Sequence, residues 1–143
     1  MDKIQFNKIT KKCFLEYGFS KIKNKYILAL DDVTIVVGFY SWRGVKSFDF
    51  YFFINCLYDA SVKFNEKYDC MTTIKMEHSP SLPGYHKHEI LFETYTEEEY
   101  TEMLTNMLHK YFDPYKENAF EFIRNNTHTM CLRKQAEAFL GLM

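Results

Sequence analysis

The spacing of apolar residues changes twice along the chain, and this change constrains the fold more than any other feature. Over residues 3–17, apolar side chains recur every three or four positions, as on one face of an α-helix. Over residues 19–92 they alternate, and β-branched and aromatic residues dominate, which is typical of strands. Helical spacing returns at residue 96. This sequence of elements predicts an α+β fold, with an antiparallel sheet of about five or six strands covered on one face by the N-terminal helix and the C-terminal helices.

The first predicted helix runs from about Lys3 to Tyr17. Asp2 and Gln5 have the spacing of a capping box, and Gly18 stands where a left-handed residue commonly ends a helix. The expected core-facing residues are Phe6, Ile9, Cys13 and Tyr17. The other side, which we interpret as a solvated face, carries Lys8, Lys11, Lys12 and Glu16.

Several short segments after this helix are predicted to form strands. Short connections with no helix between them favour an antiparallel meander. Residues 58–69 fit either a loop or a short helix. The expected strands lie near residues 19–22, 26–30, 33–40, 47–57, 70–76 and 87–93.

The strand near residues 47–57 is informative because its two faces differ. One face is assigned to the core and carries Phe48, Phe50, Phe52, Ile54 and Cys56. The other face mixes polar groups with rings, which is typical of a face that is partly covered or that meets a partner. The loop before this strand pairs a tryptophan with an arginine, two residue types enriched in binding hot spots. The candidate binding surface therefore comprises Tyr40, Trp42, Arg43, Tyr51 and Phe53.

Three helices are predicted after the strands. The first begins at Thr96, which has capping-box spacing to Glu99, and an apolar stripe follows as far as Phe112. The pair Asp113-Pro114 is expected to end this helix and to begin the next. A last helix is expected from about residue 129 to residue 141.

Charge and length limit the partners and the location of the chain. Its 143 residues fit a single domain, residues 1–143. Residues 1–46 hold nine Lys/Arg against four Asp/Glu, whereas residues 47–143 hold nine against fifteen. Nucleic acid is a disfavoured partner, because a domain that binds it is expected to be basic as a whole. No apolar run reaches the roughly 20 residues of a membrane span, and the N-terminus lacks the apolar core of a signal peptide. We therefore expect a cytoplasmic protein with no membrane partner.

The glycines and cysteines exclude several common activities. The five glycines cannot form a phosphate-binding loop or a nucleophile elbow. No two of the four cysteines stand closer than 14 residues, which excludes paired-cysteine zinc and redox motifs. Cys13 and Cys56 are expected to be buried as small apolar residues. We expect no cofactor and favour a function without catalysis.

Three histidines leave an alternative open. His86 and His88 would share one face of a strand, and His78 would approach from the proline-containing loop before them. Such a site would make the chain a small-molecule- or metal-binding enzyme, although polar loop residues are the simpler interpretation. A nucleophile pair of Cys70 with His78 also remains open. Other potential ligands in this region are Glu77 and Glu89.

Stretches of the N-terminal half resemble a family of small bacterial proteins. These stretches are Phe6-Asn7-Lys8-Ile9, Glu16-Tyr17-Gly18-Phe19-Ser20-Lys21, Asn24-Lys25-Tyr26 and Asp32-Val33-Thr34-Ile35-Val36-Val37. They resemble the proteins grouped as domain-of-unknown-function 4304, which share a helix, a strand pair, further strands and C-terminal helices. Residues 38–42 depart from the polar stretch usual in that family. The resemblance implies no catalytic residue, but some relatives resemble components of bacterial toxin–immunity systems.

The sequence therefore predicts a non-enzymatic protein-interaction module, immunity-like in the form that the resemblance implies. Its partner is expected to be another protein or a second copy of the chain. The alternative is an enzyme that uses the region of His78, His86 and His88.

Overall fold

A computed structural model describes residues 1–42, 45–58, 72–75, 89–91 and 95–142, with side chains for 1–39, 48–58, 95–128 and 130–142. Helices accompany an antiparallel sheet, so the predicted α+β class is confirmed. The elements are α1 (Lys3–Tyr17), β1 (Ser20–Ile22), β2 (Lys25–Ala29), β3 (Val33–Trp42), β4 (Val45–Ile54), η1 (Asn55–Leu57), β5 (Thr72–Lys75), β6 (Glu89–Leu91), α2 (Glu97–Asn125), η4 (Thr127–Thr129) and α3 (Lys134–Phe139).

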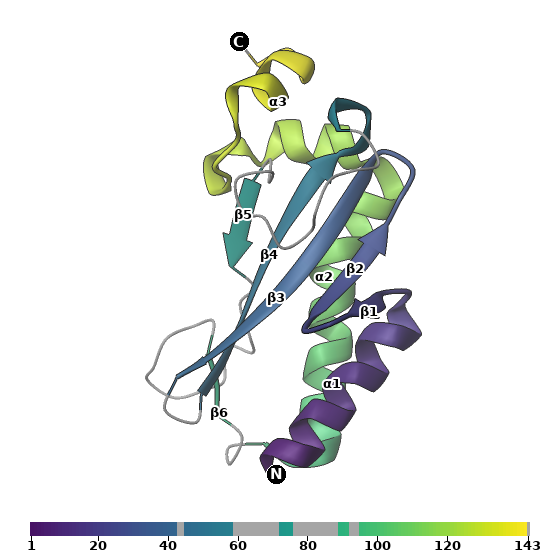
Figure 1. Cartoon of the computed structure of the whole chain (residues 1–143), viewed down its shortest axis with the longest axis vertical. Coiled ribbons are helices and arrows are strands. Elements are labelled where there is room, and N and C mark those ends of the chain that lie inside the picture. The colour runs from purple at the N-terminus through teal and green to yellow at the C-terminus, as the bar shows by residue number, and fades with distance from the viewer. Residues whose placement is uncertain (43–44, 59–71, 76–88, 92–94, 143) are drawn as a thin grey trace.

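The described strands form one antiparallel sheet (Figure 1). Its order is β1-β2-β3-β4-β5, and β6 also pairs with β4. β3 and β4 pair along their full length, from Val33 opposite Ile54 to Trp42 opposite Val45. β5 and β6 pair with successive parts of the other edge of β4. The long β3–β4 pair is therefore the centre of the sheet.

α1 begins and ends where the sequence predicts. The Asp2 carboxylate accepts a hydrogen bond from the backbone N–H of Gln5 at 2.8 Å, and the Gln5 side chain accepts one from the N–H of Asp2 at 2.9 Å. The capping box is therefore confirmed. Gly18 ends the helix at φ 125°, a conformation that residues with a Cβ rarely adopt.

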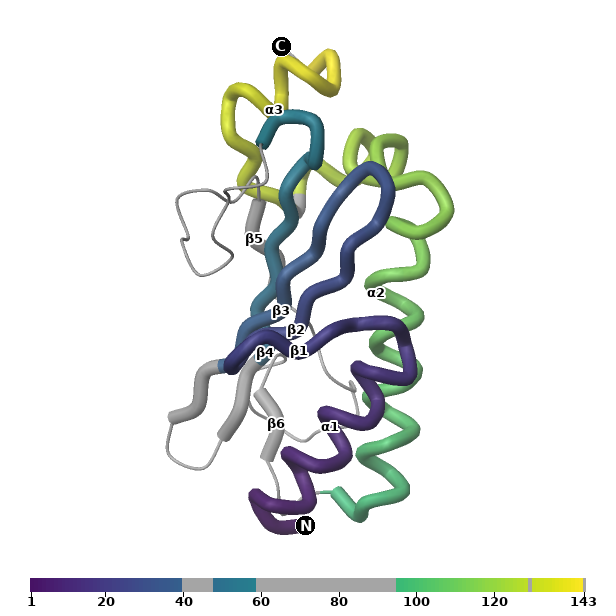
Figure 2. The backbone as a smooth tube through the Cα atoms, turned by 45° about the vertical axis from the view of Figure 1, so that its right-hand side comes forward, coloured from purple at the N-terminus to yellow at the C-terminus, as the bar shows by residue number. Residues whose placement is uncertain are grey.

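α1 and α2 lie side by side on one face of the sheet and run in the same direction (Figures 1 and 2). Residues later in α1 contact residues later in α2: Thr10 contacts Tyr100, and Tyr17 contacts Asp113. The main core lies between these helices and the sheet. Its largest fully buried rings are Phe6, Phe14, Phe48, Phe50, Phe52, Tyr100 and Phe112.

The inward side of α1 differs from the predicted stripe. Phe6 and Cys13 are buried as expected, but Ile9 and Tyr17 are only partly buried. Phe14, which lies outside that stripe, is fully buried and stacks on Tyr26 with ring centroids 4.5 Å apart. The difference arises because α1 contacts both the sheet and α2, so its inward side is wider than a single stripe.

α2 continues past the predicted break. Pro114 lies inside the helix, and the non-helical backbone is at Asn118 (φ −156°, ψ 90°). Asn118 Oδ1 accepts a hydrogen bond from the N–H of Glu121 at 3.2 Å, and its Nδ2 donates to Glu121 Oε2 at 3.1 Å. Asn118 therefore caps a new helical start. The break predicted at Asp113-Pro114 is wrong because the Asp113 carboxylate binds other side chains instead of capping.

The sheet face away from the helices is buried where the sequence predicts exposed rings. Ile27, Val36, Tyr51 and Phe53 form a second buried cluster on it, with exposed fractions between 0% and 6%. The ring of Tyr58 packs against Phe53 with centroids 5.4 Å apart. The expected partial exposure is therefore wrong at Tyr51 and Phe53, because strand alternation assigns residues to a face but does not reveal what covers it.

β4 ends at Ile54, before the predicted end of the strand at residue 57. The Asn55 side chain accepts a hydrogen bond from Thr34 Oγ1 at 2.7 Å and donates one to the carbonyl oxygen of Leu30 at 2.8 Å. These bonds hold the chain against the turn between β2 and β3 as it leaves the sheet. Cys56 is consequently exposed, so its predicted burial is wrong.

The last helix is shorter than predicted. The expected start near residue 129 is wrong, because residues 127–129 form a 3₁₀ turn and α3 begins at Lys134. Ala136 and Leu140 are buried, and Arg124 Nε donates a hydrogen bond to the carbonyl oxygen of Leu140 at 3.0 Å. These contacts hold the C-terminal segment against the end of α2.

Candidate interaction surface

The residues predicted as a binding surface do not form one exposed site. Tyr51 and Phe53 lie together, but they are 5% and 2% exposed and so offer almost no area to a partner. Tyr40 and Trp42 occupy the end of β3, and the structure describes only their backbone. Arg43 lies outside the described residues.

The predicted histidine site also lies outside the described residues, since His78, His86 and His88 all belong to the 76–88 stretch. Within the part of the chain that the structure describes, no group of three or more His, Cys, Asp or Glu residues could hold a metal ion. The metal alternative therefore stays a prediction.

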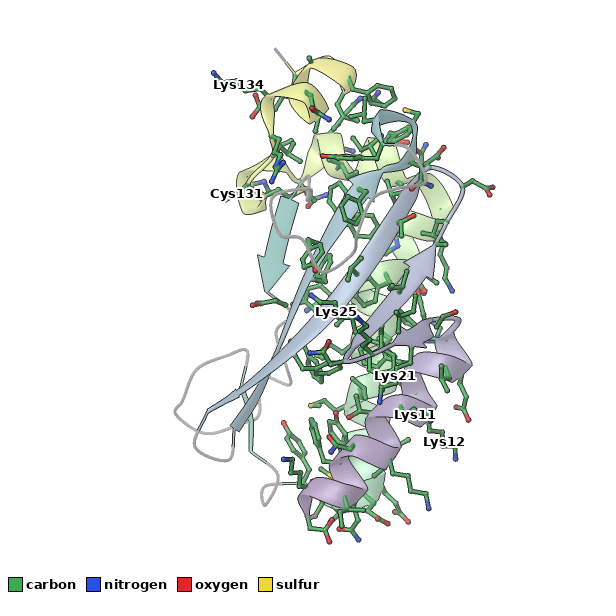
Figure 3. All side chains as sticks on the ribbon, viewed as in Figure 1. Lys11, Lys12, Lys21, Lys25, Cys131 and Lys134 are labelled. Carbon is green, nitrogen blue, oxygen red and sulfur yellow. The ribbon has the colours of Figure 1, made fainter. Side chains whose placement is uncertain are left out.

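The solvent side of α1 combines exposed charged residues with exposed apolar ones. Ile4 is 79% exposed, the largest value for any large apolar side chain described, and Leu15 is 42% exposed. Helical spacing places Lys8 and Lys11 between them, opposite the buried Phe6, Thr10, Cys13 and Phe14. In Figure 3, Lys11 and Lys12 project from α1 near β1. We call Ile4, Lys8, Lys11, Lys12 and Leu15 the basic face of α1.

A groove of about 500 Å³ lies between α1 and α2, beside this basic face. Its walls carry opposite charges, with ammonium groups on α1 and carboxylates on α2. No ion pair between described residues crosses the groove, so its lysines and glutamates are not paired with each other. The lining residues are Gln5, Lys8, Ile9, Lys12, Glu97, Glu98, Thr101 and Glu102.

Four polar side chains join the C-terminal end of α1 to the middle of α2, and we call them the polar clamp. Tyr17 donates a hydrogen bond from its hydroxyl to Asp113 Oδ1 at 2.6 Å, and His109 Nδ1 lies 3.0 Å from Asp113 Oδ2. Lys116 Nζ donates to the carbonyl oxygen of Tyr17 at 3.2 Å and lies 3.7 Å from the centroid of its ring. A cation at this position is favourable because the carbonyl groups at a helix C-terminus carry partial negative charge.

The clamp shifts the ionisation of two of its members. The hydrogen bond from Tyr17, and then that from His109, hold the pKa of Asp113 below its usual value of 3.8. Burial, followed by the hydrogen bond to the Asp113 carboxylate, raises the pKa of the Tyr17 hydroxyl. Tyr17 therefore stays a neutral donor and Asp113 an ionised acceptor.

The clamp has one arrangement that catalytic dyads also use, a carboxylate that orients a histidine through Nδ1. A cavity of about 250 Å³ beside it is lined by Cys13, His109 and Lys116, among others. Burial raises the pKa of the Cys13 thiol, and the side chain is 4% exposed. A buried, protonated thiol is a poor nucleophile, so this arrangement favours a structural role.

Lys25 lies at the border of the buried outer cluster. Its Nζ donates a hydrogen bond to the Tyr51 hydroxyl at 2.7 Å and lies 5.2 Å from the centroid of that ring. This lysine therefore belongs to the packing of the sheet and not to a free basic surface.

Sequence reasoning missed both the groove and the polar clamp. The four-residue spacing of His109 and Asp113 was the available signal, because such residues are neighbours on a helix. Ile4 was a second signal, since it is a large apolar residue outside the predicted core stripe. Nothing in the sequence indicated that Lys116 would reach α1, because that contact joins residues 99 positions apart.

None of the described helices is long and apolar enough to cross a membrane. Comparison with models of protein families, with curated proteins and with solved structures finds no match. The resemblance to domain-of-unknown-function 4304 therefore stays a prediction.

Proposed function

We propose that this chain is a non-enzymatic, cytoplasmic protein-interaction module that binds through the basic face of α1. The observation that carries the proposal is the 79% exposure of Ile4 beside lysines that form no ion pair with any described residue. An exposed apolar side chain favours burial against a partner, and unpaired charges around it steer the approach. The outer face of the sheet offers less support, because Tyr51 and Phe53 are buried.

The chemistry of this face favours an acidic protein surface as the partner. Lys8, Lys11 and Lys12 are exposed, and Glu16 is the one acidic residue on the same solvent side of α1. A nucleic acid fits less well, because the chain as a whole has a formal net charge of −1.

The test compares three tagged chains in lysate of the source organism, after brief chemical cross-linking and quantitative mass spectrometry. The first chain is unchanged, the second carries Lys8→Glu with Lys12→Glu, and the control carries Lys23→Glu with Lys134→Glu. The control makes the same change in net charge on exposed residues outside α1, in the turn between β1 and β2 and at the start of α3. Far-UV circular dichroism checks that all three are folded.

We expect at least one protein, which can be an untagged second copy, to be recovered with the first and control chains and lost about tenfold with the second. A tenfold loss fits the removal of two charge contacts. If all three chains recover the same proteins in the same amounts, the basic face of α1 is not a binding surface and the proposal is wrong.

The immunity-like role is a narrower form of the proposal, in which the captured partner is a toxin that the chain suppresses. Assaying that partner with and without the chain tests it, and undiminished activity in the complex contradicts it. The enzyme alternative keeps its own test, because a site of His78, His86 and His88 would give stoichiometric metal that is lost in His86→Ala.

A further inference from the structure

α1 and α2 carry opposite charges at matching positions along their parallel axes. Lys8 and Lys12 line one wall of the groove between α1 and α2, and Glu98 and Glu102 line the other wall. The helices are parallel and begin at the same end of the molecule (Figure 1). One copy of the chain therefore presents two lysines on α1 directly beside two glutamates on α2.

A second copy is the simplest molecule that matches this arrangement. A two-fold axis can be placed outside the groove and parallel to the helices. Rotation about this axis keeps each residue at the same position along the helix direction and exchanges the two sides of the groove. It therefore sets α1 of one copy on α2 of the other at both contacts, as an isologous interface requires. We propose that the α1–α2 layer binds a second copy of this chain about such an axis, with Lys8 and Lys12 of each copy facing Glu98 and Glu102 of the other.

The charges also select this axis over the alternative. A two-fold axis in the plane of the layer but perpendicular to the helices would set α1 on α1 and α2 on α2. Lysines would then face lysines and glutamates would face glutamates, which is repulsive. The apolar part of the contact is supplied by Ile9, which lines the groove.

This inference rests on the proposed interaction role of α1 and names its partner. Contacts between exposed charges are individually weak and are screened by salt. The dimer is therefore expected at low ionic strength and high protein concentration, and it should dissociate by about 0.5 M NaCl.

Sedimentation velocity on the purified full chain tests the inference by exchanging charges. One variant carries Lys8→Glu with Lys12→Glu and makes both helices acidic at this level. A second carries Glu98→Lys with Glu102→Lys and makes both helices basic there. The control is again Lys23→Glu with Lys134→Glu.

We expect the unchanged chain and the control to dimerise in about 50 mM NaCl, and each charge variant alone to be a monomer. An equal mixture of the two charge variants should form a heterodimer, because each contact then joins an acidic helix to a basic one. Dimers of either charge variant alone, or a mixture that stays monomeric, overturn the inference.

An unchanged chain that stays monomeric at about 1 mM also overturns it. If the lysine variant still loses a protein in the lysate comparison, that result leaves the proposed function standing with a different partner. If no protein is lost there either, both the inference and the proposed function fail. The two failures are thus distinguishable.

Discussion

The outer face of the sheet and the solvent face of α1 differ from their sequence-based predictions in opposite ways. The first is more buried than predicted, and the second exposes a large apolar side chain that was not predicted. The outer face has the large rings expected at an interface, yet Tyr51 and Phe53 are buried. The face of α1 is a row of lysines of ordinary appearance, yet it holds Ile4 at 79% exposure and charges without described ion pairs. An aromatic side chain indicates a binding surface only after its burial within its own chain is known.

The largest expected effect comes from testing whether the outer cluster is a core. Phe53→Ala should lower the free energy of unfolding by about 3–5 kcal/mol, because it removes a buried ring and leaves a cavity. Urea denaturation followed by circular dichroism measures the change. A loss below about 1 kcal/mol would show that Phe53 does not stabilise the fold and would restore its predicted role in binding.

A smaller effect tests the border of that cluster. Tyr51→Phe removes the hydroxyl that accepts the hydrogen bond of the Lys25 ammonium, and it should cost about 1–2 kcal/mol. The same denaturation assay applies. Lys25→Met is the matched control, and the double variant should lose little more than the larger single loss, because both substitutions remove one contact. Fully additive losses would contradict a shared contact.

The polar clamp adds an intermediate case to this comparison, because its side chains are partly exposed and yet hydrogen-bonded within the chain. The pKa of Asp113 is lower in the folded chain, so its carboxylate stabilises the fold above its unfolded pKa near 3.8. This contribution is lost as the pH falls through the folded pKa. The difference in unfolding free energy between the unchanged chain and Asp113→Asn should therefore shrink from about pH 5 to about pH 2.5. A difference that is constant over this range would mean that the pKa of Asp113 is not lowered by folding.

The smallest expected effect on stability lies on the basic face of α1. Ile4→Ser should change the free energy of unfolding by no more than about 0.5 kcal/mol, because the side chain is 79% exposed. The same substitution should weaken recovery of the bound protein in the lysate comparison. A destabilisation comparable to that of Phe53→Ala would place Ile4 in the packing of the fold and remove the basis for the proposed surface.

The sequence was sufficient for features set by neighbouring residues. The bounds of α1 follow from the capping box of Asp2 with Gln5 and from the conformational freedom of Gly18. The start of α2 follows from Thr96, whose side chain accepts a hydrogen bond from the N–H of Glu99 at 3.1 Å, one of the two bonds of the predicted capping box. Local chemistry determines these ends, so a single sequence contains the information.

Features that depend on distant residues could not be predicted in this way. The break in α2 moves to Asn118 because Asp113 is engaged by Tyr17, a residue 96 positions earlier. The burial of Tyr51 and the opposite charges along the groove likewise depend on which elements lie next to each other. Periodicity identifies the face of each element, but it does not identify the neighbour of that face.

The parallel arrangement of α1 and α2 has a consequence for the order in which the chain can fold. Thr10 and Tyr100, whose hydroxyls are 2.7 Å apart in the core, are separated by 90 residues. A ribosome that adds roughly 5–20 residues per second needs on the order of ten seconds to synthesise that interval. Throughout this time the α2-facing side of α1 lacks its partner, and only the strands are available to cover its apolar residues. α1 is synthesised before the strands and before α2, yet it is thus among the last of these elements to complete its packing.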